Sequence, residues 1–199
     1  MQEIDFTSTI LKDNISSLAV VAAKPGDGNT TATIGLALAL RHYARKRKPV
    51  LAVDMVGTGD MAALLEDREA ADYPQGLAPS CQQLRGSTLI LDDVLFFSPE
   101  AAELERVKLH RQLAALWVSA LVAVHDFVLF DLPAYNQNPG FAVFMRALGG
   151  AIITLNCRTS RWEVAQDMKE RLDKSNVNVI GVILNRRSYP VPAAIQTLL

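Results

Sequence analysis

The sequence predicts an α/β fold in which a mostly parallel sheet is covered by helices on both faces. Strand and helix signals alternate along the chain, and the strand signals are continuous apolar runs. Three predicted strands end in a glycine-rich loop or an aspartate, and the carboxyl ends of parallel strands meet at one sheet edge. With 199 residues, 50% hydrophobic and 21% charged, the chain suits a single globular domain.

The first half of the chain supplies two strands and two helices. A buried strand is expected at 18–23, which is short, apolar and rich in β-branched residues. A helix is expected from Thr31 to Lys48, with a basic C-terminal end that suits the helix macrodipole. A second strand spans Pro49 to Asp54, and a short helix is expected at Asp60–Leu65. The segment 72–86 contains prolines and glycines and is expected to be a loop.

In the middle of the chain, the sequence predicts a strand, a long helix and a third buried strand. Thr88 to Phe97 is a mixed apolar run of strand type. Apolar residues at helical spacing predict a helix from Pro99 to Val124, with Pro99 and Glu100 in its first turn. Phe127 to Asp131 is a strand that ends in an aspartate.

In the last part of the chain, the sequence predicts two strands joined by a helix. The strands are Ala151–Asn156 and Val177–Leu184. The helix runs from about Arg161 to Lys174, and Ser160 is predicted to cap it. Trp162 in this helix is interpreted as a packing or interface anchor.

The loop Ala23-Lys-Pro-Gly-Asp-Gly-Asn-Thr-Thr31 has the pattern of a phosphate-binding P-loop between a strand and a helix. Gly26 and Gly28 permit the close backbone approach that such a loop needs, and Thr30 stands where a hydroxyl would reach Mg²⁺. Asn29 occupies the position at which the chemistry requires lysine. The alternative interpretation is a tight strand-to-helix turn that binds no ligand.

The order and spacing of the motifs resemble the MinD/ParA-type ATPases. The resemblance rests on Lys24 at the second loop position, Asp54 followed by Gly-Thr-Gly-Asp60, the segment Asp126–Pro133 and the ending Gly181–Arg187. Within that group the chain is most similar to the cytoplasmic domain of bacterial tyrosine autokinases of capsular and exopolysaccharide assembly. We therefore expect an N-terminal extension at 1–16, one three-layer P-loop NTPase-like domain at 17–187, and a C-terminal tail at 188–199.

The resemblance implies roles for individual residues. Asp54 would orient the attacking water or hydroxyl, Asn185 would contact the adenine, and Lys24 would reach the phosphates of the partner subunit in a nucleotide-sandwich dimer. The expected catalytic residues are Asp54 and Lys24, and the expected metal-binding residues are Thr30 and Asp131. The expected nucleotide-binding residues are Lys24, Pro25, Gly26, Asp27, Gly28, Asn29, Thr30, Thr31 and Asn185.

Three departures from the family pattern bear on activity. Asn29 lacks the positive charge whose contact with phosphate is worth about 1.5–3 kcal/mol. Val56 stands where the relatives usually carry a second acidic residue. The tail contains only Tyr189, whereas the autokinases end in a tyrosine cluster. We therefore predict weak or absent ATP hydrolysis and no autophosphorylation of a tyrosine tail.

Three functional hypotheses remain open. The first is a degenerate autokinase-like protein that binds ATP or ADP with Mg²⁺ weakly and regulates a membrane polysaccharide chain-length or export protein. The second is an active ATPase that uses Lys24 across a homodimer, and the third is a scaffold without nucleotide. A net charge of −1 gives no case for a nucleic-acid partner. The expected location is the cytoplasm, peripheral at the inner membrane through a partner. Arg186 and Arg187 are interpreted as facing either a partner or water.

Overall fold

The computed structural model describes residues 6–44, 48–65, 86–102, 104–105 and 111–186. Seven strands form one sheet in the order β3-β4-β2-β5-β1-β6-β7. All neighbouring strands are parallel except β3 and β4, which confirms the predicted fold class. The strands are β1 Ser17–Ala22, β2 Val50–Asp54, β3 Gly86–Leu91, β4 Val94–Pro99, β5 Phe127–Leu132, β6 Gly150–Asn156 and β7 Val179–Asn185.

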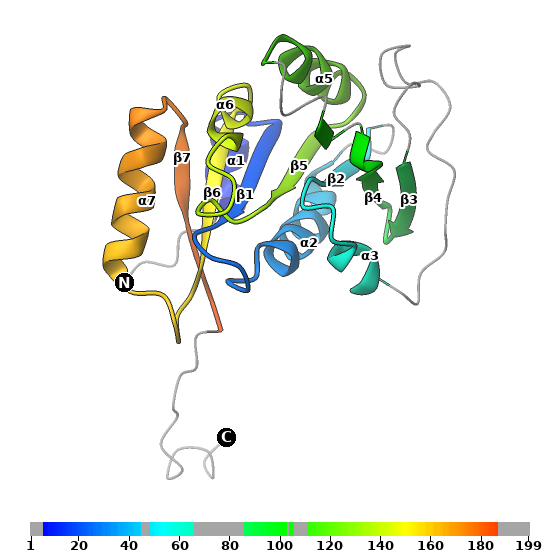
Figure 1. Cartoon of the computed structure of the whole chain (residues 1–199). Coiled ribbons are helices and arrows are strands. Elements are labelled where there is room, and N and C mark those ends of the chain that lie inside the picture. The colour runs from blue at the N-terminus through cyan, green and yellow to red at the C-terminus, as the bar shows by residue number, and fades with distance from the viewer. Residues whose placement is uncertain (1–5, 45–47, 66–85, 103, 106–110, 187–199) are drawn as a thin grey trace, which may run out of the picture.

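Helices cover both faces of this sheet (Figure 1). One face packs against α5, α6 and α7, and the other packs against α1, α2 and α3. The helices are α1 Phe6–Lys12, α2 Asn29–Leu40, α3 Asp60–Ala63, α5 Arg111–Val124, α6 Phe141–Met145 and α7 Trp162–Lys174. Within the described ranges, no helix has the length and apolar character needed to cross a bilayer.

The central strands are buried on both faces because each alternates its side chains between two apolar clusters. In β1, Ala19 and Val21 belong to the cluster under α5, α6 and α7, whereas Leu18 and Val20 belong to the cluster under α2. This two-sided burial explains why the strand signals are continuous apolar runs. It also fixes the position of the loop that follows β1 at the middle of the sheet edge.

Helix α2 ends earlier than predicted. It stops at Leu40, a short 3₁₀ turn follows at Arg41–Tyr43, and Ala44 has an extended backbone. The predicted helix end at Lys48 was therefore wrong. The chain must turn back to enter β2, and the residue before Pro49 is disfavoured in a helical conformation. Arg41 secures the turn, because its guanidinium donates to the Asp92 carbonyl at 2.8 Å.

The predicted strand Thr88–Phe97 is a hairpin of two antiparallel strands, β3 and β4. Asp92 and Asp93 join them with φ angles of 51° and 62°, as a tight two-residue hairpin turn requires. The predicted helix start at Pro99 was also wrong, because Pro99 belongs to β4 and pairs with Gly86. Helical backbone occurs at 101–102 and 104–105, and α5 begins at Arg111.

The remaining element predictions are confirmed to within a few residues for α3, β1, β2, β5, β6, α7 and β7. The predicted loop 72–86 lies outside the described residues except for Gly86, which is in β3. The expected N-terminal extension contains α1, whose Ile10 is buried against the α2 side of the sheet. The proposed domain boundaries stay a prediction.

Candidate nucleotide site

The predicted site residues meet at the carboxyl edge of the sheet, where β1, β2 and β5 are neighbours. Asp54 at the end of β2 is directly opposite Asp131 on β5. Asp131 is in turn opposite Val20 on β1, which leads into the P-loop. The sheet therefore brings together three features that are separated by up to about a hundred residues in the sequence, as the parallel topology predicts.

The P-loop adopts a tight turn that depends on its glycines. Gly26 and Gly28 have φ angles of 82° and 91°, and α2 begins at Asn29. A Cβ atom on Gly26 would have no heavy atom within 4 Å, so space is open above that residue. A Cβ atom on Gly28 would overlap the Asn185 side-chain nitrogen. A side chain at position 28 would therefore displace the Asn185 amide, and the positive φ favours glycine there.

Asn29 is bound to the end of β5. Its side-chain nitrogen donates to Asp131 Oδ1 at 2.7 Å and to the Leu132 carbonyl oxygen at 2.8 Å. Both amide hydrogens are thus used, and Thr33 donates its hydroxyl to the Asn29 carbonyl at 2.9 Å. A neutral amide fills the place of the expected lysine and fastens the first turn of α2 to the neighbouring strand.

Asp131 is a buried carboxyl group with one unused oxygen. It is fully buried, and its Oδ2 atom has no hydrogen-bond partner. Burial raises the pKa of Asp131 to about 7; neighbouring polar side chains, led by Thr30, oppose the rise, and the charge of Asp54 adds to it. Burial dominates because it removes water from the charged form. An unpartnered buried oxygen of this kind is available to a water molecule, a metal ion or a ligand.

Asp54 organises the loop that follows β2. It is 2% exposed, and its Oδ1 atom accepts hydrogen bonds from the backbone amides of Val56 at 2.9 Å and Gly57 at 3.2 Å. Val56, at the position of the missing acidic residue, is half-buried. This carboxylate therefore shapes the turn, whatever further role it has toward a ligand.

Asp27 joins the P-loop to two later segments of the chain. It is 2% exposed, and its carboxylate accepts hydrogen bonds from the Lys24 backbone amide and from the Ser160 hydroxyl, both at 3.0 Å. The Asp27 carbonyl accepts from the Asn185 side chain at 3.1 Å. The loop is thus braced against the segment before α7 and against the end of β7.

The hydrogen bond between Ser160 and Asp27 shows that one sequence prediction was wrong. Ser160 does not cap α7: the N-cap residue is Arg161, and no side chain caps that helix end. The Ser160 hydroxyl is bonded to Asp27, which lies 133 residues away in the sequence. Sequence reasoning missed this contact because a serine before a helix carries the signal of a local cap.

Lys24 lines a cavity of about 290 Å³ between the P-loop and α7, together with Tyr135, Asn136, Met168 and Arg171. Among the described residues, the Lys24 ammonium group has no ion pair or hydrogen bond. Of the other predicted loop residues, Thr30 is half-buried in the first turn of α2, and Pro25 and Thr31 are exposed. The structure shows no contact that assigns Pro25 or Thr31 a role.

The donor set fits a magnesium ion bound together with a phosphate ligand. The described residues contain no group of three His, Cys, Asp or Glu side chains that could hold a metal. Mg²⁺ is often held by one or two carboxylates plus phosphate and water oxygens. Asp131 Oδ2, the Thr30 hydroxyl and the open space above Gly26 are compatible with that arrangement.

Comparisons with solved structures identify this fold. The kinase domain of VpsO superposes with a TM-score of 0.69 at 14% identity, covering 93% of this chain and 92% of that chain. The kinase domain of the Escherichia coli tyrosine kinase ETK gives 0.63 at 18%, covering 92% and 75%. A nucleotide-binding protein from Archaeoglobus fulgidus in complex with ADP gives 0.56 at 17%, covering 94% and 72%.

Neither a protein-family model nor a curated protein matches the chain in sequence. At identities of 14–18%, the structural matches establish the fold, which is P-loop NTPase-like. The similarity inferred from the sequence motifs is thereby confirmed at the level of the fold. The roles of individual site residues stay predictions.

Proposed function

We propose that this chain is a degenerate, tyrosine-autokinase-like P-loop protein that binds ATP or ADP with Mg²⁺ weakly and hydrolyses ATP little or not at all. One observation carries the proposal. The residue in the lysine position, Asn29, is neutral, and its amide is bonded to Asp131, the predicted metal ligand. The loop has two glycines with positive φ, as the predicted P-loop requires, but it lacks the charge that would neutralise the phosphates.

Different residues of the chain would contact the phosphates and the metal ion. The backbone of the loop around Gly26 and Gly28 would hold phosphate oxygens, and Thr30 with Asp131 Oδ2 would face the metal. Bound Mg²⁺ would supply phosphate charge neutralisation. Without the lysine, a charge-assisted contact of about 1.5–3 kcal/mol is missing, which corresponds to a Kd roughly 10- to 150-fold higher. Lys24 is the one loop cation that could replace part of that charge.

The proposed cellular role follows from the resemblance to the bacterial tyrosine autokinases. We infer that the protein acts in capsule or exopolysaccharide assembly, as a homodimer that regulates a membrane chain-length or export protein from the cytoplasmic side. Two of the structural matches are described as kinase domains, and one nucleotide-binding match is an ADP complex. These descriptions support the proposal through the shared fold.

Calorimetric titration with Mg·ADP and Mg·ATP, together with a phosphate-release assay, tests the proposed function. We expect measurable binding that Asp131→Ala abolishes, and turnover far below the range of about 1–1000 s⁻¹ that enzymes usually show. An absence of binding at millimolar nucleotide would favour the scaffold hypothesis. Ordinary turnover that Lys24→Ala abolishes would establish an active ATPase instead.

A further inference from the structure

Four basic residues lie in the P-loop or in the two segments that are hydrogen-bonded to it, and we call Lys24, Arg158, Arg161 and Arg186 the basic rim. The three arginines are exposed and Lys24 is half-buried. Within the described part of the chain, none of the four has a side-chain hydrogen bond or an ion pair. The rim is therefore a set of positive charges without internal partners.

Hydrogen bonds hold the loops that carry the rim next to one another. Asn156 and Asn185 are opposite residues of β6 and β7, and the Cys157 amide donates to the Asn185 carbonyl at 3.0 Å. The Arg158 amide donates to the Asn156 side chain at 3.0 Å. The Asp27 carboxylate bridges the Lys24 backbone amide and the Ser160 hydroxyl. All four rim residues thus lie within one residue or two of this network.

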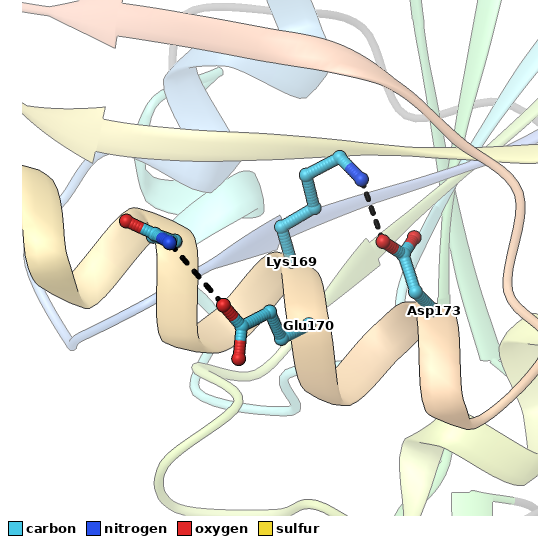
Figure 2. Close-up of polar contacts among 4 residues, drawn as sticks. Lys169, Glu170 and Asp173 are labelled. Carbon is cyan, nitrogen blue, oxygen red and sulfur yellow. Dashed lines mark hydrogen bonds and ion pairs between the residues drawn. The ribbon is translucent and has the colours of Figure 1, made fainter.

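Two cations on α7, in contrast to those of the rim, have carboxylate partners. On the outer face of α7, Lys169 pairs with Asp173 at 2.6 Å (Figure 2). Arg171 pairs with Asp167 at 2.8 Å on the same helix. Near the rim, the exposed Glu163 in the first turn of α7 and the buried Asp27 carry carboxylates that offset part of the four charges. The chain as a whole has a net charge of −1, so the positive charge is local.

Apolar surface adjoins these charges. Trp162, the residue after Arg161, is 74% exposed, and Leu184, two residues before Arg186, is 42% exposed. Tryptophan and arginine are the residue types most enriched where binding energy concentrates in protein interfaces. An exposed tryptophan that follows an unpaired arginine therefore has the composition of an interface centre.

We propose that the basic rim, with Trp162 and Leu184, is the docking surface for an acidic peptide segment of a partner protein, one that also carries an apolar side chain. Unpaired guanidinium groups match carboxylates, and Trp162 matches the apolar residue. The alternative anionic partner is a nucleic acid. Nucleic-acid-binding domains are usually strongly basic, whereas this chain has a pI of about 6.3. This inference deepens the proposed function, because it places on the structure the surface through which the regulated partner binds.

The test uses the full chain and a synthetic peptide of glutamates around one leucine, labelled for fluorescence anisotropy. We expect binding that weakens with added salt and that is absent for the matched glutamine peptide. The rim variant Arg158→Gln/Arg161→Gln/Arg186→Gln should bind at least about tenfold more weakly. The control variant Lys12→Gln/Lys169→Gln/Lys174→Gln, which removes equal charge from exposed positions of α1 and α7, should bind like the wild type. Equal affinity of the rim and control variants would refute the proposal.

Trp162→Phe supplies a second variant that leaves the charge unchanged. We expect several-fold weaker peptide binding from the smaller apolar contact, and undiminished binding would remove Trp162 from the docking surface. An oligonucleotide that binds more tightly than the acidic peptide would replace the proposal with nucleic-acid binding.

Calorimetry with Mg·ADP on the same proteins separates this inference from the proposed function. Nucleotide binding that disappears in the rim variant while peptide binding is unchanged would assign the arginines to the phosphate site and overturn the docking surface. Peptide binding by a wild-type protein that binds no nucleotide would keep the docking surface and overturn the proposed nucleotide function.

Discussion

The side-chain amide of Asn29 donates to the carboxylate of Asp131 at 2.7 Å. This bond connects the position that defines the chemistry of a P-loop with the carboxylate predicted to hold its metal. Because the amide is neutral, it occupies one carboxylate oxygen without balancing its charge. The residue that stands in the lysine position is therefore also a hydrogen-bond partner of Asp131.

Restoring the lysine should strengthen nucleotide binding. We expect Asn29→Lys to lower the Kd for Mg·ADP roughly 10-fold or more, because a charged contact to phosphate contributes about 1.5–3 kcal/mol. Calorimetric titration measures the change, with Asn29→Gln as a neutral control of increased length. Unchanged or weaker binding by the lysine variant would show that the loop does not cradle phosphates in the assumed way.

The two loop glycines should respond differently to alanine. Both have left-handed backbones, so each substitution costs about 1–2 kcal/mol of strain. Gly28→Ala should cost about 0.5–1.5 kcal/mol more, because its Cβ atom would displace the Asn185 side chain from its hydrogen bond to the Asp27 carbonyl, whereas Gly26→Ala meets no atom within 4 Å. Urea unfolding measures both free energies. Equal costs for the two variants would mean that Asn185 does not lie over Gly28.

The stability of the protein should fall as the pH rises toward neutrality because of Asp131. Its pKa is raised from 3.8 to about 7, so the folded state keeps a proton that the unfolded state releases at lower pH. The contribution to stability is therefore fully present below pH 3.8 and is lost as the pH rises through 7.

Asp131→Asn isolates this effect. The variant should lack the decline, so its free energy of unfolding relative to wild type should increase by on the order of 3 kcal/mol between about pH 5 and about pH 8. Urea unfolding with a chelator present provides the comparison. A parallel pH dependence in the two proteins would contradict the buried position of this carboxyl group.

The contact between Ser160 and Asp27 should be detectable as an energetic coupling. Ser160→Ala removes a hydrogen bond to a buried carboxylate and should cost about 1.5–3 kcal/mol. In a double-mutant cycle with Asp27→Asn, a large part of that cost should disappear when Asp27 has already been changed. Additive costs in the cycle would instead support a local helix-capping role for Ser160.

Most of the fold could be predicted because burial on both faces leaves a clear pattern in the strands. β1, β5 and β6 are continuous apolar runs, since helices cover each side of the sheet. The hairpin was missed for a local reason: Asp92-Asp93 is a weaker turn signal than Asn-Gly, and the flanking residues are apolar throughout. Helix α2 ends early because the chain turns into β2, and the spacing of apolar residues does not indicate where such a turn begins.

The site could be predicted as a set of residues but not as a set of bonds. Parallel topology places Asp54 and Asp131 side by side once each is known to end a strand. The Asn29 and Ser160 contacts join residues 102 and 133 positions apart, and no local pattern encodes such pairings. Motif spacing therefore predicts which residues gather at the sheet edge, whereas their hydrogen-bond partners follow from the packing.

The brace at Asp27 has a consequence for how the protein is made. The partners of Asp27 lie 133 and 158 residues later in the chain, at Ser160 and Asn185, and contacts of such high sequence separation form slowly. A chain that leaves the ribosome from its N-terminus exposes the P-loop early, yet cannot complete its hydrogen bonding until β7 has emerged. The P-loop is thus synthesised before the two segments that complete its hydrogen bonding.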